Sequence, residues 1–137
     1  MRVGSISLFE RMQDLRGFEN LMVDMLSHKE QFHHLARAIT DYNLKQIHRW
    51  SETAVDEVLI SDDWGTQRRV MISPPLWEEL FQPYYEEMCD AIHTSGKFVQ
   101  MHSDGHILDI IPGIISCLSF TKSPVSRRII APGRDCS

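Results

Sequence analysis

The sequence lacks the features that mark secreted, membrane-bound and nucleic-acid-binding proteins. Its three cysteines are odd in number and show no Cys-x-x-Cys spacing, a pattern typical of a reducing compartment rather than of a disulfide framework. No apolar stretch approaches the length of a signal peptide or a membrane span, so we expect a cytoplasmic protein without a membrane partner. The net charge of -5 does not suggest the basic stripe of a nucleic-acid-binding protein, so we expect no nucleic-acid partner.

The composition is that of one globular domain with a basic end. Of the 137 residues, 42% are hydrophobic and 24% are charged, which permits a hydrophobic core. The basic stretch is the tail, which contains Lys122, Arg127, Arg128 and Arg134 against a single acid, Asp135. We expect residues 116–137 to form a poorly ordered or solvated end, because short charged tails seldom pack.

Two long helical segments are predicted in the first half of the chain. Apolar residues recur at helical spacing over residues 8–26, where Gly17 divides the run into two helices, and again over residues 28–51. Ser27 and Glu30 have the spacing of a capping box at the start of the second segment.

The second half predicts a strand, a helix and a second strand. Residues 55–60 and 98–101 are short apolar runs typical of buried strands. Between them, Ser73-Pro74-Pro75 favours the start of a helix, and residues 107–115 form another helical pattern. A strand–helix–strand unit of this length indicates parallel strands, so the predicted fold class is α/β with flanking helices.

Polar residues follow both predicted strands, where parallel α/β folds place their ligand sites. The first strand is followed by Asp-Asp-Trp-Gly at 62–65, and the second by His-Ser-Asp-Gly at 102–105. If the strands are neighbours, their ends lie about 5 Å apart. Four ionisable side chains are therefore predicted to share one edge of the sheet: Asp62, Asp63, His102 and Asp104.

Each of these residues has a structural alternative. An aspartate before glycine often caps its own loop, and we favour one of Asp62 and Asp63 capping while the other faces a ligand. His102 is either a core histidine or a functional group, and its place at a strand end favours function. Asp104 serves equally well as the cap of a helix that starts near Gly105.

Three motifs in a fixed order carry a resemblance to a known family. They are DDWG, the SPxxWxxxxxPxY pattern that begins at Ser73, and HSDG; they lie in the stretches LFERMQDLRGFENLMVDML and VDEVLISDDWGTQRRVMISPPLWEELFQPYYEEMCDAIHTSGKFVQMHSDGHILDIIPGII. This combination resembles the uroporphyrinogen decarboxylase superfamily, which includes the corrinoid-dependent methyltransferases.

The resemblance implies a partial (β/α)8 TIM barrel over residues 1–115, with a substrate cleft at the carboxyl ends of its strands. A complete barrel needs about 250 residues, so we expect a fragment. Residues 116–137 depart from the family, and we expect this tail to come from truncation or a change of reading frame.

The resemblance also implies site residues. In the decarboxylases the loop that matches residues 61–65 contacts a substrate carboxylate, which implies substrate binding by Asp62, Asp63, Trp64 and Gly65. An acid at Asp63 repels a carboxylate unless it is protonated or bridged by a metal. The family's catalytic aspartate and arginine-rich loop belong to earlier parts of the barrel, which weighs against porphyrinogen decarboxylation. The candidate catalytic residues of this segment are Asp63 and His102.

In the methyltransferase branch, the loop that matches residues 102–105 reads His-x-Cys and holds zinc together with a later cysteine. Asp104 replaces that first cysteine, and aspartate also ligates zinc. The resemblance therefore implies zinc as the cofactor, with His102 and Asp104 as ligands. Cys117 and Cys136 are poor substitutes for the later cysteine.

These expectations define two functional hypotheses. The first is an enzyme segment, either a lyase of porphyrin metabolism acting on a carboxylated tetrapyrrole or a cobamide-dependent methyltransferase acting on a methylated small molecule. A corrinoid protein is the partner that the full-length family implies for the latter. The alternative is a non-catalytic truncated remnant, or a fragment that self-associates into a homo-oligomer because so few strands leave open sheet edges.

Overall fold

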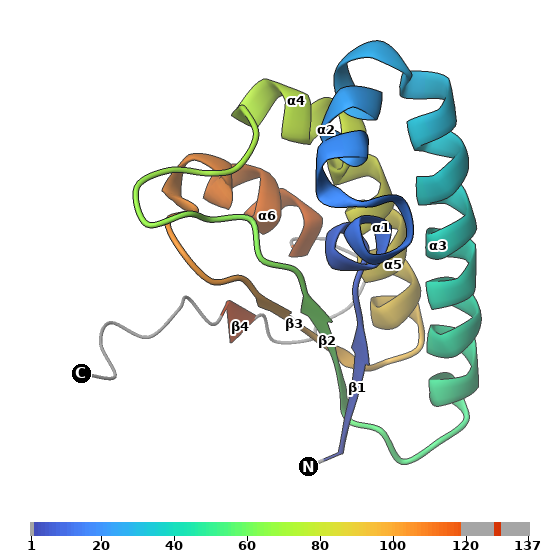
Figure 1. The fold of residues 1–137 in the computed structure, drawn as a ribbon. Helices are drawn as coiled ribbons and strands as arrows, with labels where there is room; N and C mark the ends of the chain where they lie inside the picture. Colours follow the sequence, from blue (N-terminus) through green and yellow to red (C-terminus); the bar gives the residue numbers. More distant parts are fainter. Residues whose placement is uncertain (1, 119–127, 130–137) are drawn as a thin grey trace.

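The computed structural model describes residues 2–118 and 128–129, which form a parallel sheet flanked by helices (Figure 1). In the described residues the sheet has the order β1-β2-β3-β4, and each neighbouring pair is parallel. Its strands are β1 (Val3–Ile6), β2 (Glu57–Ser61), β3 (Phe98–His102) and β4 (Arg128–Ile129). The predicted α/β class with parallel strands is therefore confirmed.

Helices connect the first three strands. They are α1 (Phe9–Arg16), α2 (Phe18–Ser27) and α3 (Lys29–Ser51) before β2, then α4 (Pro74–Leu80) and α5 (Gln82–Thr94) before β3. A 3-10 turn (Leu108–Ile110) leads into α6 (Ile111–Leu118). Gly17 separates α1 from α2 with φ of 84°, as predicted from its break in the apolar pattern. No helix in residues 2–118 combines the length and apolar character needed to cross a bilayer.

Two details of the sequence analysis are corrected by the structure. The Ser27–Glu30 capping box is wrong, because α3 begins at Lys29 and its N-cap residue, His28, makes no side-chain capping hydrogen bond. Strand β1 was not predicted, because its four residues alternate exposed and buried and so contain no apolar run. At Gly4 a Cβ would lie 2.8 Å from the Trp50 ring, so glycine lets α3 pack closely on this strand.

The sheet has one buried face and one open face. Gly4, Ile6, Val58, Ile60, Val99 and Met101 alternate along the strands and are buried. The opposite face is at least partly exposed at Ser5, Leu59, Gln100, Ser61 and His102. Because one face is open, the polar strand ends on it are accessible from solvent.

An ion pair links α1 to α2. Arg16 Nε donates to Asp24 Oδ2 at 2.6 Å, and this guanidinium lowers the pKa of Asp24. A carboxyl group whose pKa is lower in the folded state stabilises the fold at pH values above its unfolded pKa of about 3.9. This stabilisation is lost as the pH falls through the lower pKa of the folded state.

We therefore expect Asp24→Asn to reduce the free energy of unfolding by about 1 kcal/mol at pH 7, the size usual for a pair with one exposed partner. The difference between variant and wild type should disappear by pH 2 to 3 in urea titrations. A difference that persists unchanged in acid would contradict an electrostatic origin.

Most of the tail lies outside the described residues; its described parts are residues 116–118, which belong to α6, and Arg128–Ile129. The expectation of a poorly ordered end does not hold for residues 116–118, which are helical, and stays a prediction for the rest of the tail. Helix α6 ends at Leu118, three residues beyond the boundary at 115 that the resemblance placed for the barrel segment.

Candidate functional site

The register of the sheet brings the two polar loops together. Ser61 is paired with His102 at the carboxyl ends of β2 and β3, and the Asp62 amide donates to the His102 carbonyl at 3.1 Å. The loops that begin at Asp62 and Ser103 therefore leave the sheet side by side. Their predicted proximity is confirmed by this pairing.

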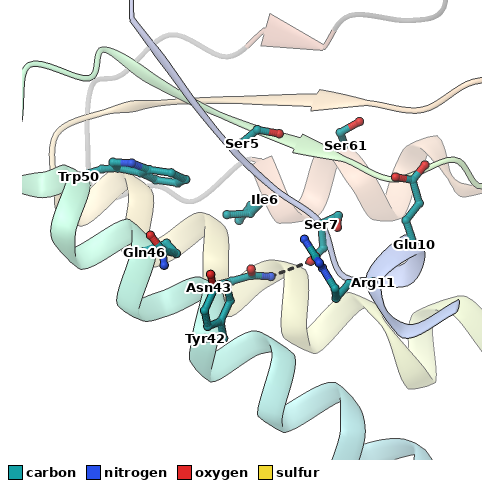
Figure 2. A pocket seen from close by; sticks show the side chains of 10 residues that line it. All are labelled: Ser5, Ile6, Ser7, Glu10, Arg11, Tyr42, Asn43, Gln46, Trp50 and Ser61. Atoms are coloured by element: carbon teal, nitrogen blue, oxygen red, sulfur yellow. Dashed lines mark hydrogen bonds between the residues drawn. The ribbon is translucent and has the colours of Figure 1, made fainter. Parts of the chain in front are cut away.

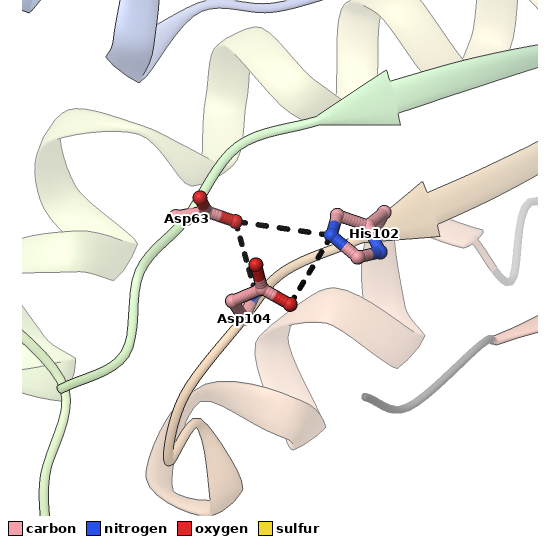
Figure 3. A group of neighbouring side chains, drawn as sticks. All are labelled: Asp63, His102 and Asp104. Carbon is pink, nitrogen blue, oxygen red and sulfur yellow. Dashed lines mark hydrogen bonds and ion pairs between the residues drawn. The ribbon is translucent and has the colours of Figure 1, made fainter. Parts of the chain in front are cut away.

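Three of the four predicted ionisable side chains form one cluster, Asp63–His102–Asp104 (Figure 3). His102 Nε2 lies 3.4 Å from Asp104 Oδ1 and 3.9 Å from Asp63 Oδ1. The side chains are 40% exposed at Asp63, 36% at His102 and 67% at Asp104, so the cluster is open to solvent. The alternative of Asp104 as a helix cap does not hold, because the next helical turn starts at Leu108 and has no side-chain cap.

Backbone contacts between the two loops hold the cluster in place. The Asp104 amide donates to Asp63 Oδ1 at 2.9 Å, which orients that carboxylate toward His102. The Gly65 amide donates to the Asp104 carbonyl at 3.1 Å. Gly65 and Gly105 pack backbone to backbone, where a Cβ on Gly105 would lie 2.4 Å from the Gly65 carbonyl carbon. Glycine at both positions is thus a requirement of the site.

Asp62 is buried and caps helix α1 from a distance of 54 residues in sequence. Its carboxylate accepts hydrogen bonds from the Leu8 amide at 2.9 Å, the Glu10 amide at 2.9 Å and the Tyr85 hydroxyl at 2.7 Å. Burial raises the pKa of Asp62 to about 6, although the donors at Glu10, Tyr85 and Leu8 lower it. Asp62 therefore fixes the start of α1 relative to β2.

Trp64 belongs to the hydrophobic core. Its ring stacks on Phe9 with centroids 3.9 Å apart, and its Nε1 donates to the Tyr85 hydroxyl at 3.1 Å. Contact of Asp62 and Trp64 with substrate stays a prediction, and their contacts in the structure are with the interior of the protein. Within DDWG, Asp63 is the residue whose side chain reaches the open edge.

Glu10 is a further acidic group that the sequence analysis missed. It belongs to the first turn of α1, and burial, followed by the negative charges of Asp62 and Asp63, raises its pKa. It also lines a cavity of about 370 Å³ beside β1, together with Ser61 and Arg11 (Figure 2). Glu10 could not be identified as a site residue from the sequence without predicting β1, because that strand places α1 at the edge of the sheet where Asp63 lies.

The chemistry of the cluster fits a divalent metal ion. One ligand atom from each of Asp63, His102 and Asp104 lies within 4.8 Å of the other two. Ligand atoms held about 2.0–2.2 Å from a tetrahedral zinc ion are themselves about 3.4 Å apart, close to the two distances measured from His102. Three protein ligands with an open fourth position are the arrangement of catalytic zinc sites.

Four parallel strands flanked by helices, with a polar cluster at their carboxyl edge, define a segment of a (β/α) barrel. Residues 3–120 match the uroporphyrinogen decarboxylase (URO-D) family, which is most of the chain, so the protein belongs to this family. No curated protein matches the chain.

A comparison of structures agrees with this fold. A methyltransferase from Methanosarcina mazei superposes with a TM-score of 0.73 at 14% sequence identity. The alignment covers 85% of this chain and 33% of the methyltransferase chain, so the protein spans about a third of that structure's length.

Proposed function

We propose that the Asp63–His102–Asp104 cluster is a divalent-metal site, with zinc as the ion, and that the chain is the thiol-activating segment of a corrinoid-dependent methyltransferase. The observation that supports this proposal is the convergence of one imidazole nitrogen and two carboxylate oxygens at the ends of neighbouring strands. The superposition on a methyltransferase agrees with it at the level of the fold.

The charge of this edge favours methyl transfer over decarboxylation. Glu10, Asp63 and Asp104 are partly or largely exposed around it, and Asp62 lies just beneath. A substrate that carries several carboxylates is repelled by such a group of acids, whereas a cation is attracted. Decarboxylation of a carboxylated tetrapyrrole is therefore the weaker candidate.

Each residue has a distinct role in the proposed site. His102 would bind the ion from the end of β3 and Asp104 from the loop after β3. Asp63 would bind it from the loop after β2, oriented by the Asp104 amide. When bound, the ion would lower the pKa of a coordinated thiol, so that the thiolate is available at neutral pH. Glu10 lines the adjoining cavity and is available to accept the proton that the thiol loses.

Metal titration tests the proposal directly. We expect the purified chain to bind one zinc or cobalt(II) ion, detected by calorimetry and by the visible absorption of cobalt(II). Replacement of His102 by alanine removes the only nitrogen ligand of the cluster, and we expect binding to weaken by roughly 100-fold or more. His34→Ala is the matched control, because His34 is exposed on α3 and outside the cluster.

The second step of the test is activity. The metal-loaded chain is supplied with methylcobalamin and a small thiol, and loss of the methyl–cobalt bond is followed by absorption. Equal metal binding by His102→Ala and His34→Ala would refute the site. Stoichiometric metal binding without methyl transfer would retain the site and refute the methyltransferase assignment for this chain.

A further inference from the structure

The cavity beside β1 is a candidate ligand site of its own. Its volume of about 370 Å³ lies in the range of roughly 300–1,000 Å³ that small-molecule pockets occupy. Glu10 and Ser61 line one end, and Trp50 lines the other (Figure 2). The cavity suits a polar ligand, because polar side chains form most of its wall: Ser5, Ser7, Glu10, Arg11, Tyr42, Asn43, Gln46 and Ser61.

The polar groups of this wall do not satisfy one another. Among the ten residues that line the cavity, one hydrogen bond involves a side chain: Asn43 Nδ2 donates to the Ser7 carbonyl at 2.8 Å (Figure 2). Arg11 makes no ion pair with the described residues, whereas Arg16 and Arg37 on the neighbouring helices each pair with an acid. The Arg11 guanidinium is therefore available to an anionic group of a ligand.

The cavity carries two opposite charges that are held apart. Glu10 and Arg11 are consecutive residues of α1, so their side chains leave the helix about 100° apart and do not face each other. Figure 2 shows the Glu10 carboxylate near the strand end at Ser61 and the Arg11 guanidinium turned toward Ser7. The end at Glu10 therefore attracts a cation, while Arg11 attracts an anion.

The neighbourhood of Glu10 strengthens this polarity. Asp62 and Asp63 lie within electrostatic reach of Glu10, so acids are concentrated at that end of the cavity. A ligand with two carboxylates would place one of them against this acidic end, and a ligand with two ammonium groups would place one against Arg11. A molecule with one charge of each sign meets a favourable partner at both positions.

We infer that this cavity binds a small zwitterion of the amino-acid class, with its ammonium group at Glu10 and its carboxylate at Arg11. The fork of N–H donors on a guanidinium fits a carboxylate in two parallel hydrogen bonds. The serine hydroxyls and the Gln46 amide are available to the rest of the ligand. None of these contacts uses a metal ion, so the inference does not depend on the proposed metal site.

Tryptophan fluorescence provides a direct measurement on the intact chain. Of the three tryptophans, Trp64 and Trp77 are buried, whereas Trp50 is partly exposed and lines the cavity. A bound ligand should therefore shield Trp50 from quenching by acrylamide. Glycine, β-alanine and 4-aminobutyrate are zwitterions of increasing charge separation, and butyrate and butylamine are the singly charged analogues of the longest.

We expect at least one of the three zwitterions to shield Trp50 at millimolar concentration, and to bind roughly tenfold more tightly than butyrate or butylamine. Shielding by none of the zwitterions would overturn the inference. Butyrate or butylamine that binds as tightly as the best zwitterion would also overturn it, because the cavity would then recognise a single charge.

Charge-removing variants assign the two ends of the ligand. We expect Arg11→Gln and Glu10→Gln each to weaken zwitterion binding roughly tenfold, measured by calorimetry. Arg49→Gln and Glu19→Gln are the matched controls, because both residues are exposed on helices and neither lines the cavity. Equal effects of the cavity variants and their controls would refute these contacts.

The metal site and the cavity are separated by one further variant. His102→Ala is expected to lose metal binding and to keep zwitterion binding, because His102 does not line the cavity. Circular dichroism should show the same helix content in all these variants. A chain that binds metal but no zwitterion would refute this inference and leave the proposed metal site intact, and the reverse result would refute the metal site alone.

Discussion

Gly105→Ala is expected to lower the free energy of unfolding by about 4 kcal/mol or more, a large part of the 5–15 kcal/mol typical of a domain. The backbone of Gly105 has φ of 80°, where an L-residue costs about 1–2 kcal/mol. The larger cost is steric, because the new Cβ would lie 2.4 Å from both the carbonyl carbon and oxygen of Gly65. Backbone cannot rotate away as a side chain can, so the two loops must separate.

Gly96→Ala isolates the contribution of backbone conformation. Gly96 follows α5 with φ of 76°, and a Cβ there meets nothing within 4 Å. We expect this variant to cost about 1 kcal/mol in urea unfolding, with metal binding unchanged. In contrast, Gly105→Ala should also abolish metal binding, because separation of the loops moves Asp104 away from Asp63. Equal costs for the two variants would show that the loops are not locked together.

The sequence was sufficient to predict the helices and the two central strands. Residues 28–51 and 98–101 have clear periodicity or a continuous apolar run, because they pack along one stripe or lie inside the sheet. β1 escaped prediction because it is four residues long at the edge of the described sheet, with Val3 and Ser5 exposed. Its position depends on contacts with residues more than 50 positions away, which local patterns do not contain.

The location of the candidate site could be predicted from the sequence, but the separate roles of its residues could not. The rule that parallel strands deliver ligands at their carboxyl ends selected Asp63, His102 and Asp104 correctly as neighbours. It could not separate Asp62 from Asp63, because adjacent residues differ only in the side of the chain on which they point. Asp62 points inward to the start of α1, a helix that the sequence places 54 residues earlier.

The buried Asp62 provides a test of what holds α1 against the sheet. Asp62 accepts hydrogen bonds from Leu8, Glu10 and Tyr85, and all three donors lose their acceptor in Asp62→Ala. A buried donor left unpaired costs about 1–3 kcal/mol, and removal of the buried charge offsets part of the sum. We therefore expect a net loss of about 3 kcal/mol in the free energy of unfolding at pH 7, measured by urea denaturation.

Asp56→Ala provides a comparison of the same type. Asp56 Oδ2 accepts the Arg2 amide at 2.9 Å, also across 54 residues, but this contact is exposed to solvent. Water replaces the lost acceptor there, so we expect a cost under about 1 kcal/mol. If Asp62→Ala costs no more than Asp56→Ala, then the aromatic stack of Phe9 on Trp64, rather than the buried carboxylate, holds α1 against the sheet. In that case Trp64→Ala should lower the free energy of unfolding more than Asp62→Ala does. Trp64, rather than Asp62, would then be the residue of DDWG that positions α1.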